Sequence, residues 1–159
     1  RADSLLVSLG PGSFTGVRIG LATARALGFA WTAQVRGYPT LALVAAQAQQ
    51  DYPGAPVTVC MNGGHGEWFV QDFGADSLPT SNLKSLTPEA ALAVSAQTLI
   101  AGNRAEPFAA LLGDRHRAIT LLPDAAQIGR VPDALLTEHL APIYGRGADA
   151  VPMADRTPA

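Results

Sequence analysis

The hydrophobic positions in the first part of the chain change from a short continuous run to a helical spacing. Residues 4–9 form an apolar run that ends at Gly10, which predicts a buried strand of a parallel sheet. Residues 14–31 carry apolar side chains at alternating steps of four and three, which predicts one long helix with a buried stripe. The expected members of this stripe are Val17, Leu21, Ala24, Gly28 and Trp31.

Shorter elements are predicted along the rest of the chain. Strands are expected at residues 33–38, 57–61, 67–73 and 98–101. Helices are expected at residues 41–50, 88–97, 125–129 and 132–139, with Thr40 and Thr87 as the N-caps of the first two. The glycine-rich turn at 62–66 joins two of the strands into a hairpin. Strands that alternate with helices indicate an α/β fold, and the hairpin indicates a mixed sheet in its second part.

The loop from Tyr52 to Pro56 is the candidate hinge of the chain, because it combines proline and glycine between two periodic segments. It divides the sequence into a first α/β lobe at 1–53 and a second α/β lobe at 54–145. The remaining residues, 146–159, are rich in glycine, proline and charge, and we expect a flexible tail there.

Composition excludes several classes of protein. The chain has 159 residues, of which 48% are hydrophobic, so it can bury a core. Its formal net charge of −2 argues against a domain that binds nucleic acid by itself. Cys60 is the single cysteine, which rules out an internal disulfide or a zinc–cysteine cluster and fits a reducing, cytoplasmic compartment. No segment of the sequence is apolar for long enough to cross a membrane.

Small residues recur every four positions along the predicted long helix, at Gly16, Gly20, Ala24 and Gly28. Glycine inside a helix costs about 1 kcal/mol relative to alanine, so this repeat needs a reason. Removing side chains lets another backbone approach closely. We therefore expect this face to pack against other helices, within the chain or on a partner. Ordinary packing on the helix's own sheet is the alternative.

The segment from Gly10 to Gly16 lies between a predicted strand and a predicted helix, which is where phosphate-binding loops occur. It lacks the lysine of a nucleotide P-loop, and its glycines do not have the dinucleotide spacing. A tight structural turn, with Ser13 as the N-cap of the helix, is the simpler interpretation. If the loop does bind an anion, the candidate residues are Gly10, Gly12, Ser13, Thr15 and Arg18.

Catalytic and metal-binding patterns are not found in the sequence. His65, His116 and His139 do not share metal-ligand spacing, and no G-x-S-x-G elbow occurs. Cys60 lies within an apolar run, which favours a buried, inert thiol. We therefore predict no catalytic residue and no metal ligand.

The run from Gly10 to Gly20, GPGSFTGVRIG, resembles the signature of the TsaB (YeaZ) family. Three later segments resemble family elements in the same order, at 37–41, 61–69 and 140–146. Two positions of the hairpin depart from the family pattern, since Asn62 stands where aspartate is common and Gly64 where arginine is common. Family members usually carry more of the first lobe ahead of the Gly-Pro-Gly loop, so we expect the first lobe to be incomplete in this chain.

This resemblance implies an actin-like (ASKHA, ribonuclease H-like) fold with two lobes and a role in making threonylcarbamoyladenosine (t6A) in tRNA. It implies a non-catalytic scaffold or activator subunit that binds a TsaD homologue, with a TsaE-type ATPase as a further partner and only indirect contact with tRNA. A homodimer is the alternative assembly. No cofactor is expected on this chain, while ATP or ADP is expected at the level of the complex. The implied interface residues lie on the glycine-bearing helix, at Gly16, Val17, Gly20, Leu21, Ala24 and Gly28.

An alternative function keeps the same fold but uses the loop from Gly10 to Gly16 differently. In this second hypothesis the chain is a nucleotide-binding ATPase or regulatory switch, with Ser13 and Thr15 near the phosphates. The missing loop lysine stands against it.

Overall fold

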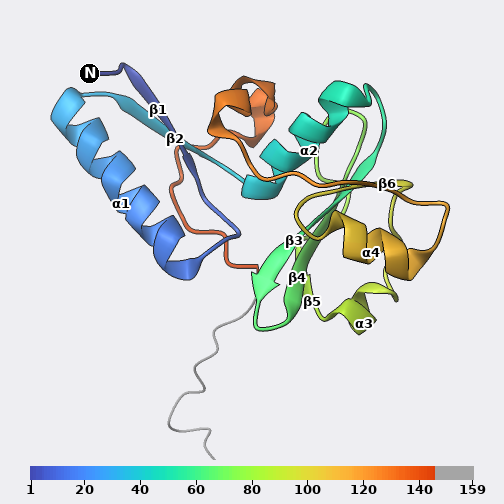
Figure 1. The fold of residues 1–159 in the computed structure, drawn as a ribbon. Coiled ribbons are helices and arrows are strands. Elements are labelled where there is room, and N and C mark those ends of the chain that lie inside the picture. The colour runs from blue at the N-terminus through green and yellow to red at the C-terminus, as the bar shows by residue number, and fades with distance from the viewer. Residues whose placement is uncertain (146–159) are drawn as a thin grey trace, which may run out of the picture.

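Two sheets of different size form the framework of the computed structural model, which describes residues 1–145 (Figure 1). The smaller sheet pairs β1 (Ser4–Ser8) with β2 (Gln34–Tyr38) in parallel. The helix α1 (Phe14–Trp31) connects β1 to β2 in the sequence and covers one face of the pair. The predicted tail at 146–159, and with it Arg146 of the last family-like segment, lies outside the described residues.

The long helix has the predicted bounds because its ends are well specified. The Ser13 hydroxyl accepts a hydrogen bond from the backbone N–H of Gly16 at 3.3 Å, so Ser13 is confirmed as the N-cap. At the other end, Thr32 takes a left-handed conformation with φ of 55°, and its N–H bonds back to the last turn. The predicted buried stripe is confirmed at its centre, since Leu21, Ala24 and Gly28 are buried, while Val17 and Trp31 at its two ends are half-buried.

The larger sheet has the strand order β5-β4-β3-β6-β7. Its strands are β3 (Val57–Gly64), β4 (Glu67–Phe73), β5 (Lys84–Leu86), β6 (Leu99–Ala101) and β7 (Arg117–Ile119). The pairs β3–β4 and β4–β5 are antiparallel, whereas β3–β6 and β6–β7 are parallel. The predicted hairpin and the predicted mixed sheet are therefore confirmed.

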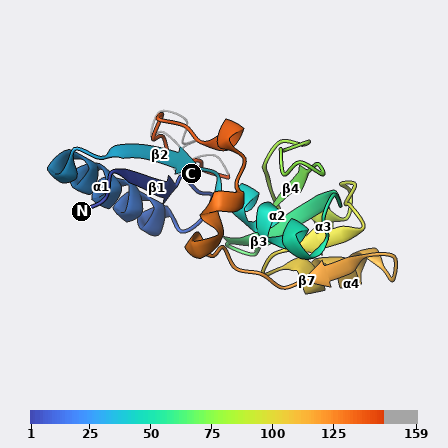
Figure 2. The same cartoon turned by 90° about the horizontal axis from the view of Figure 1, so that it is seen from above.

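Helices cover both faces of this sheet (Figure 2). The helix α2 (Thr40–Asp51) packs on one face, and α3 (Pro88–Ala91) and α4 (Ala105–Leu112) pack on the other. Alternation along β3 divides its side chains between two cores: Val57 and Val59 face α2, while Cys60 faces α4. Two 3-10 helices, η1 (Ala125–Arg130) and η2 (Asp133–Leu135), follow the larger sheet in the sequence. Within that part, no helix is long and apolar enough to cross a membrane.

The packing of α2 differs from the predicted division into lobes at residues 53 and 54. Its buried side chains, including Leu41 and Val44, belong to the core of the larger sheet. Thr40 is not the N-cap of α2 either. Pro39 holds that position without a side-chain bond, and the Thr40 hydroxyl instead lies 2.6 Å from the hydroxyl of Ser8.

Two predicted helices are much shorter than expected. The helix after Thr87 ends at Ala91, because the chain is then drawn onto the sheet, where the Gln97 N–H donates to the Thr58 hydroxyl at 2.8 Å. The helix predicted at 132–139 is reduced to η2, because Thr137 forms an antiparallel bridge with Gly37 of β2. The short strands β5 and β7 were not predicted.

Candidate functional site

Gly20 and Gly28 of α1 face the helix's own sheet. A Cβ atom on Gly28 would overlap the Val35 side chain of β2, and one on Gly20 would lie 3.9 Å from Val7 of β1. Glycine at these positions lets the helix lie close to its strands. Leu21, Ala24 and Gly28 are buried within the chain, and their expected part in an interface stays a prediction.

The other three predicted interface residues lie nearer to solvent. Gly16 is exposed in the first turn of α1, and Val17 and Gly20 are half-buried at the margin of the buried stripe. They remain candidates for the edge of an interface. The centre of the exposed surface, however, is formed by residues that were not predicted from the sequence.

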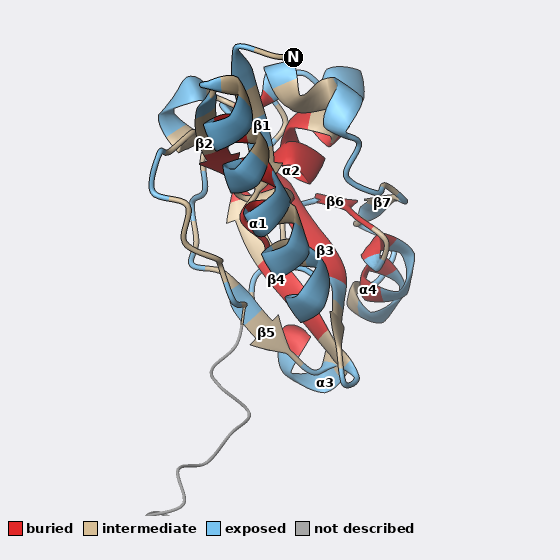
Figure 3. Ribbon diagram, turned by 90° about the vertical axis from the view of Figure 1, so that its left-hand side faces the viewer, coloured by how far each residue is buried: buried red, intermediate tan, exposed pale blue. Residues whose placement is uncertain are grey.

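The outer side of α1 is apolar as well, and it faces solvent (Figure 3). Phe29 is 92% exposed, Ile19 is 61% exposed, and Ala22 and Ala26 lie between them in the sequence. We call these four residues the outer face of α1. Their spacing of three and four residues places them on one side of the helix. The sequence carries a signal for this face, because apolar residues also occupy the side of the helix opposite the glycine repeat.

An open groove lies at the end of the outer face. It has a volume of about 570 Å³ and is formed between the end of α1 and the start of β2. Phe29 and Arg25 contribute to its lining from the helix, and Gln34 and Val35 contribute from the strand. The groove is continuous with the exposed Phe29 ring, so the outer face and the groove form one surface.

The last described segment, residues 137–145, returns to the smaller sheet and runs beside α1. We call it the C-terminal strap. Thr137 exchanges backbone hydrogen bonds with Gly37, and the Ile143 N–H donates to the Leu9 carbonyl at 2.7 Å. Gln34 of β2 donates to the Glu138 carboxylate at 2.6 Å. The strap is thus tied to β2 and to the residue that follows β1.

Two arginines of α1 meet the strap. Arg18 donates from Nε to the Tyr144 hydroxyl at 3.0 Å, and its guanidinium lies 3.7 Å from the centre of the Phe14 ring. The Phe14 and Tyr144 rings pack at 5.5 Å. Arg25 donates to the Leu140 carbonyl at 2.8 Å. The strap therefore fixes the direction of both cations.

The loop from Gly10 to Gly16 is in contact with the strap at its base. Gly10 has a φ of 98°, its carbonyl accepts from the Thr40 N–H at 2.8 Å, and a Cβ on it would lie 2.6 Å from the Ile143 carbonyl oxygen. Among the candidate anion-binding residues, Ser13 caps the helix and Arg18 is engaged with Tyr144, while Gly12 and Thr15 are exposed. Anion binding at this loop stays a prediction.

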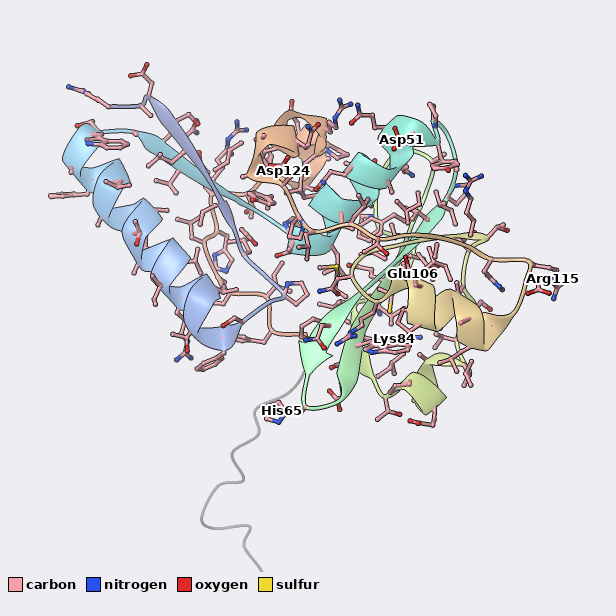
Figure 4. All side chains as sticks on the ribbon, viewed as in Figure 1. Asp51, His65, Lys84, Glu106, Arg115 and Asp124 are labelled. Carbon is pink, nitrogen blue, oxygen red and sulfur yellow. The ribbon has the colours of Figure 1, made fainter. Side chains whose placement is uncertain are left out.

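The titratable residues of the larger sheet do not converge on one point. Figure 4 shows His65 at the tip of the hairpin, with Glu106 and Arg115 on and after α4 and with Asp51 and Asp124 beyond the opposite face. Within residues 1–145, no group of three or more His, Cys, Asp or Glu side chains is placed to hold a metal ion. Asn62, which departs from the family pattern, is linked through its backbone: its N–H donates to the side-chain oxygen of Asn103 at 2.8 Å.

Cys60 is buried, as predicted. Burial raises the pKa of its thiol to about 12, although the positive charge of Arg104 acts in the opposite direction. A thiol with such a pKa stays protonated near neutral pH, and thiolate is the nucleophilic form.

Comparison with known proteins places the chain in a family and a fold. Two solved structures from Pseudomonas aeruginosa resemble it. An uncharacterized protein with similarity to peptidase YEAZ has a TM-score of 0.73 at 23% identity, covering 91% of this chain and 74% of that one. YeaZ has a TM-score of 0.70 at 22% identity, covering 89% of this chain and 74% of that one. No curated protein matches. Together with a family-model match, these likenesses confirm the predicted actin-like α/β fold.

The sequence match is to a family model and covers three quarters of the chain. Residues 1–119 match the model described as TsaD: tRNA N6-adenosine threonylcarbamoyltransferase. The matched region includes α1, the loop before it and the hairpin of the larger sheet. The chain therefore belongs to the TsaD family.

Proposed function

We propose that this protein is a non-catalytic scaffold or activator subunit in the t6A modification of tRNA, and that it binds a TsaD-type transferase subunit through the outer face of α1. The family match and the YeaZ-like fold support the connection with t6A. The observation that carries the binding role is the exposure of two large apolar side chains, Phe29 and Ile19, on one side of a helix.

A helix with this outer face fits a helical partner. Large exposed apolar side chains at helical spacing are the usual anchors when a helix packs into a groove or against other helices. The alanines between Ile19 and Phe29 would let a partner helix approach closely, and the groove beside Phe29 offers space for a partner side chain. Aromatic anchors near the centre of an interface commonly carry most of its binding energy.

Such a scaffold needs no cofactor of its own. ATP or ADP would act on the partner subunits, which include a TsaE-type ATPase, and tRNA would be contacted through the partner. The net charge of −2 agrees with indirect contact, because a chain that binds tRNA by itself is usually basic. The site of action would be the cytoplasm.

Binding to a TsaD homologue from the same cell tests the proposal. We expect the wild-type protein to bind it, and Phe29→Asp and Ile19→Asp each to weaken binding by about thirtyfold or more, as for anchor residues. Leu111→Asp is the matched control, because Leu111 is 49% exposed on another helix, α4. The control should bind like the wild type.

Two outcomes would contradict the proposal. One is that the wild-type protein fails to bind the TsaD homologue. The other is that both aspartate variants bind it as well as the wild type does. Self-association that Phe29→Asp removes, with no binding to the TsaD homologue, would instead identify a second copy as the partner.

A further inference from the structure

The charges of α1 are of one sign. Its eighteen residues include Arg18 and Arg25 and contain no aspartate or glutamate, although the chain as a whole has a net charge of −2. The helix that carries the outer face is therefore a positively charged element of an acidic protein. A positive patch of this kind favours partners with negative charge.

The two arginines are arranged as a pair. They are seven residues apart, which places them on the same side of the helix and about 10 Å from each other along its axis. Both are exposed and lie along one border of the outer face, next to Ala22 and Phe29. A partner that covers the outer face would therefore meet both guanidinium groups at its rim.

Both guanidinium groups are held in place without being neutralised. Arg18 is held by the Tyr144 hydroxyl and the Phe14 ring, and Arg25 by the Leu140 carbonyl. All of these groups are uncharged, so none of them cancels the positive charge of the arginine that it holds. Holding the side chains beforehand reduces the entropy that a binding partner must overcome.

We infer that α1 docks an acidic amphipathic helix of the partner subunit, whose apolar side covers the outer face and whose carboxylates pair with Arg18 and Arg25. This inference rests on the proposed function and adds the chemistry of the partner surface. Carboxylates two helical turns apart, in positions i and i+7, match the spacing of the arginines. The C-terminal strap is the positioning element, because it sets the direction of both guanidinium groups.

A second copy of the chain does not supply this surface. Pairing α1 with another α1 would bring two further arginines and no carboxylate to the border of the outer face. Like charges placed together oppose association. The charge pattern therefore favours an acidic partner over self-association.

The test measures the dissociation constant of the complex with the TsaD homologue as a function of charge and salt. Raising NaCl from about 0.05 to 0.5 M should weaken wild-type binding about tenfold, because rim ion pairs are screened. Arg18→Glu and Arg25→Glu should each weaken binding about tenfold at low salt and should reduce the salt dependence. Arg18→Lys and Arg25→Lys keep the charge and should retain most of the affinity.

Arg115→Glu is the matched control, since Arg115 is exposed at the far end of the larger sheet and the substitution changes the net charge by the same amount (Figure 4). It should bind like the wild type, and urea unfolding of every variant checks that the fold is kept.

If binding persists without any effect of salt or of the two glutamate variants, while Phe29→Asp still abolishes it, the acidic-partner inference is overturned and the scaffold role stands. If the wild type does not bind at all, the proposed function itself fails. A wild-type dimer that is stable at low salt would also overturn the inference.

Discussion

Replacing Gly28 and Gly20 by alanine in turn tests whether the glycine side of α1 packs on its own sheet. Alanine favours a helix interior over glycine by about 1 kcal/mol, and this gain is common to both substitutions. The surroundings differ. At Gly20 the new methyl group would make an ordinary contact with Val7, 3.9 Å away. At Gly28 it would overlap the Val35 side chain and lie 3.3 Å from the Ala33 carbonyl oxygen.

The overlap at Gly28 sets the expected magnitude. Adding a methyl group to a closely packed site costs about 1–3 kcal/mol, because neighbours must shift. Val35 is β-branched and has few alternative rotamers, and the Ala33 carbonyl oxygen is part of the backbone. Since the helix-propensity gain cancels in the comparison, Gly20→Ala should exceed Gly28→Ala in free energy of unfolding by about 1–3 kcal/mol. Gly20→Ala alone should be more stable than the wild type by up to about 1 kcal/mol.

Urea unfolding of the three proteins, followed by circular dichroism, measures this difference. Both variants should keep the wild-type dependence on urea concentration, so that the shift in midpoint reports stability. Equal stabilisation by the two substitutions would refute the reasoning, because it would mean that nothing is packed against Gly28. The glycine side would then be free for a partner, as the sequence first suggested.

Two further predictions concern the strap and the buried thiol. Tyr144→Ala should lower the free energy of unfolding, measured in urea, by about 1 kcal/mol, because it removes the hydrogen bond with Arg18 and the ring contact with Phe14. Tyr144→Phe keeps the ring and should lower it by less than half as much. Equal stability of the wild type and both variants would argue against the strap contact. Cys60 should resist thiol reagents in the native protein at pH 8 and react readily in denaturing urea, and rapid native labelling would contradict its burial. Because its pKa is raised in the folded state from 9.0 to about 12, the native protein binds this proton more tightly, so the Cys60 contribution to stability should decline as the pH rises above about 9.

The elements that local sequence specifies were predictable. The bounds of α1 follow from an N-cap at Ser13 and a continuous helical spacing, and the hairpin follows from a glycine-rich turn between two apolar strands. The N-cap and helical spacing lie within α1 or directly before it, and the glycine-rich turn lies within the hairpin. Thr87 was likewise confirmed as an N-cap, with Pro88 in the first turn of the helix.

The elements that depend on distant contacts were not predictable. The strands β5 and β7 have three residues each and exist because they pair with β4 and β6. An extended segment was predicted for residues 140–144, but the strap already begins at Thr137, because Thr137 pairs with Gly37, a hundred positions earlier in the sequence. The contact between Arg18 and Tyr144 joins residues 126 positions apart. No local pattern encodes such pairings, so an apparently helical spacing at 132–139 was misleading.

The candidate site shows why the helix could be predicted from the sequence while the orientation of its faces could not. Small and apolar residues occupy nearly the whole circumference of α1, so its sequence is compatible with either side against the sheet. The orientation is decided outside the helix, by Val7 and Val35, which fill the space that the glycines leave. Once that side is used for the sheet, the large side chains on the opposite side, Ile19 and Phe29, cannot be buried within the unit. The glycine repeat therefore explains how the helix approaches its own strands, and the exposed large residues beside Arg18 and Arg25 are the part of α1 that a partner can reach.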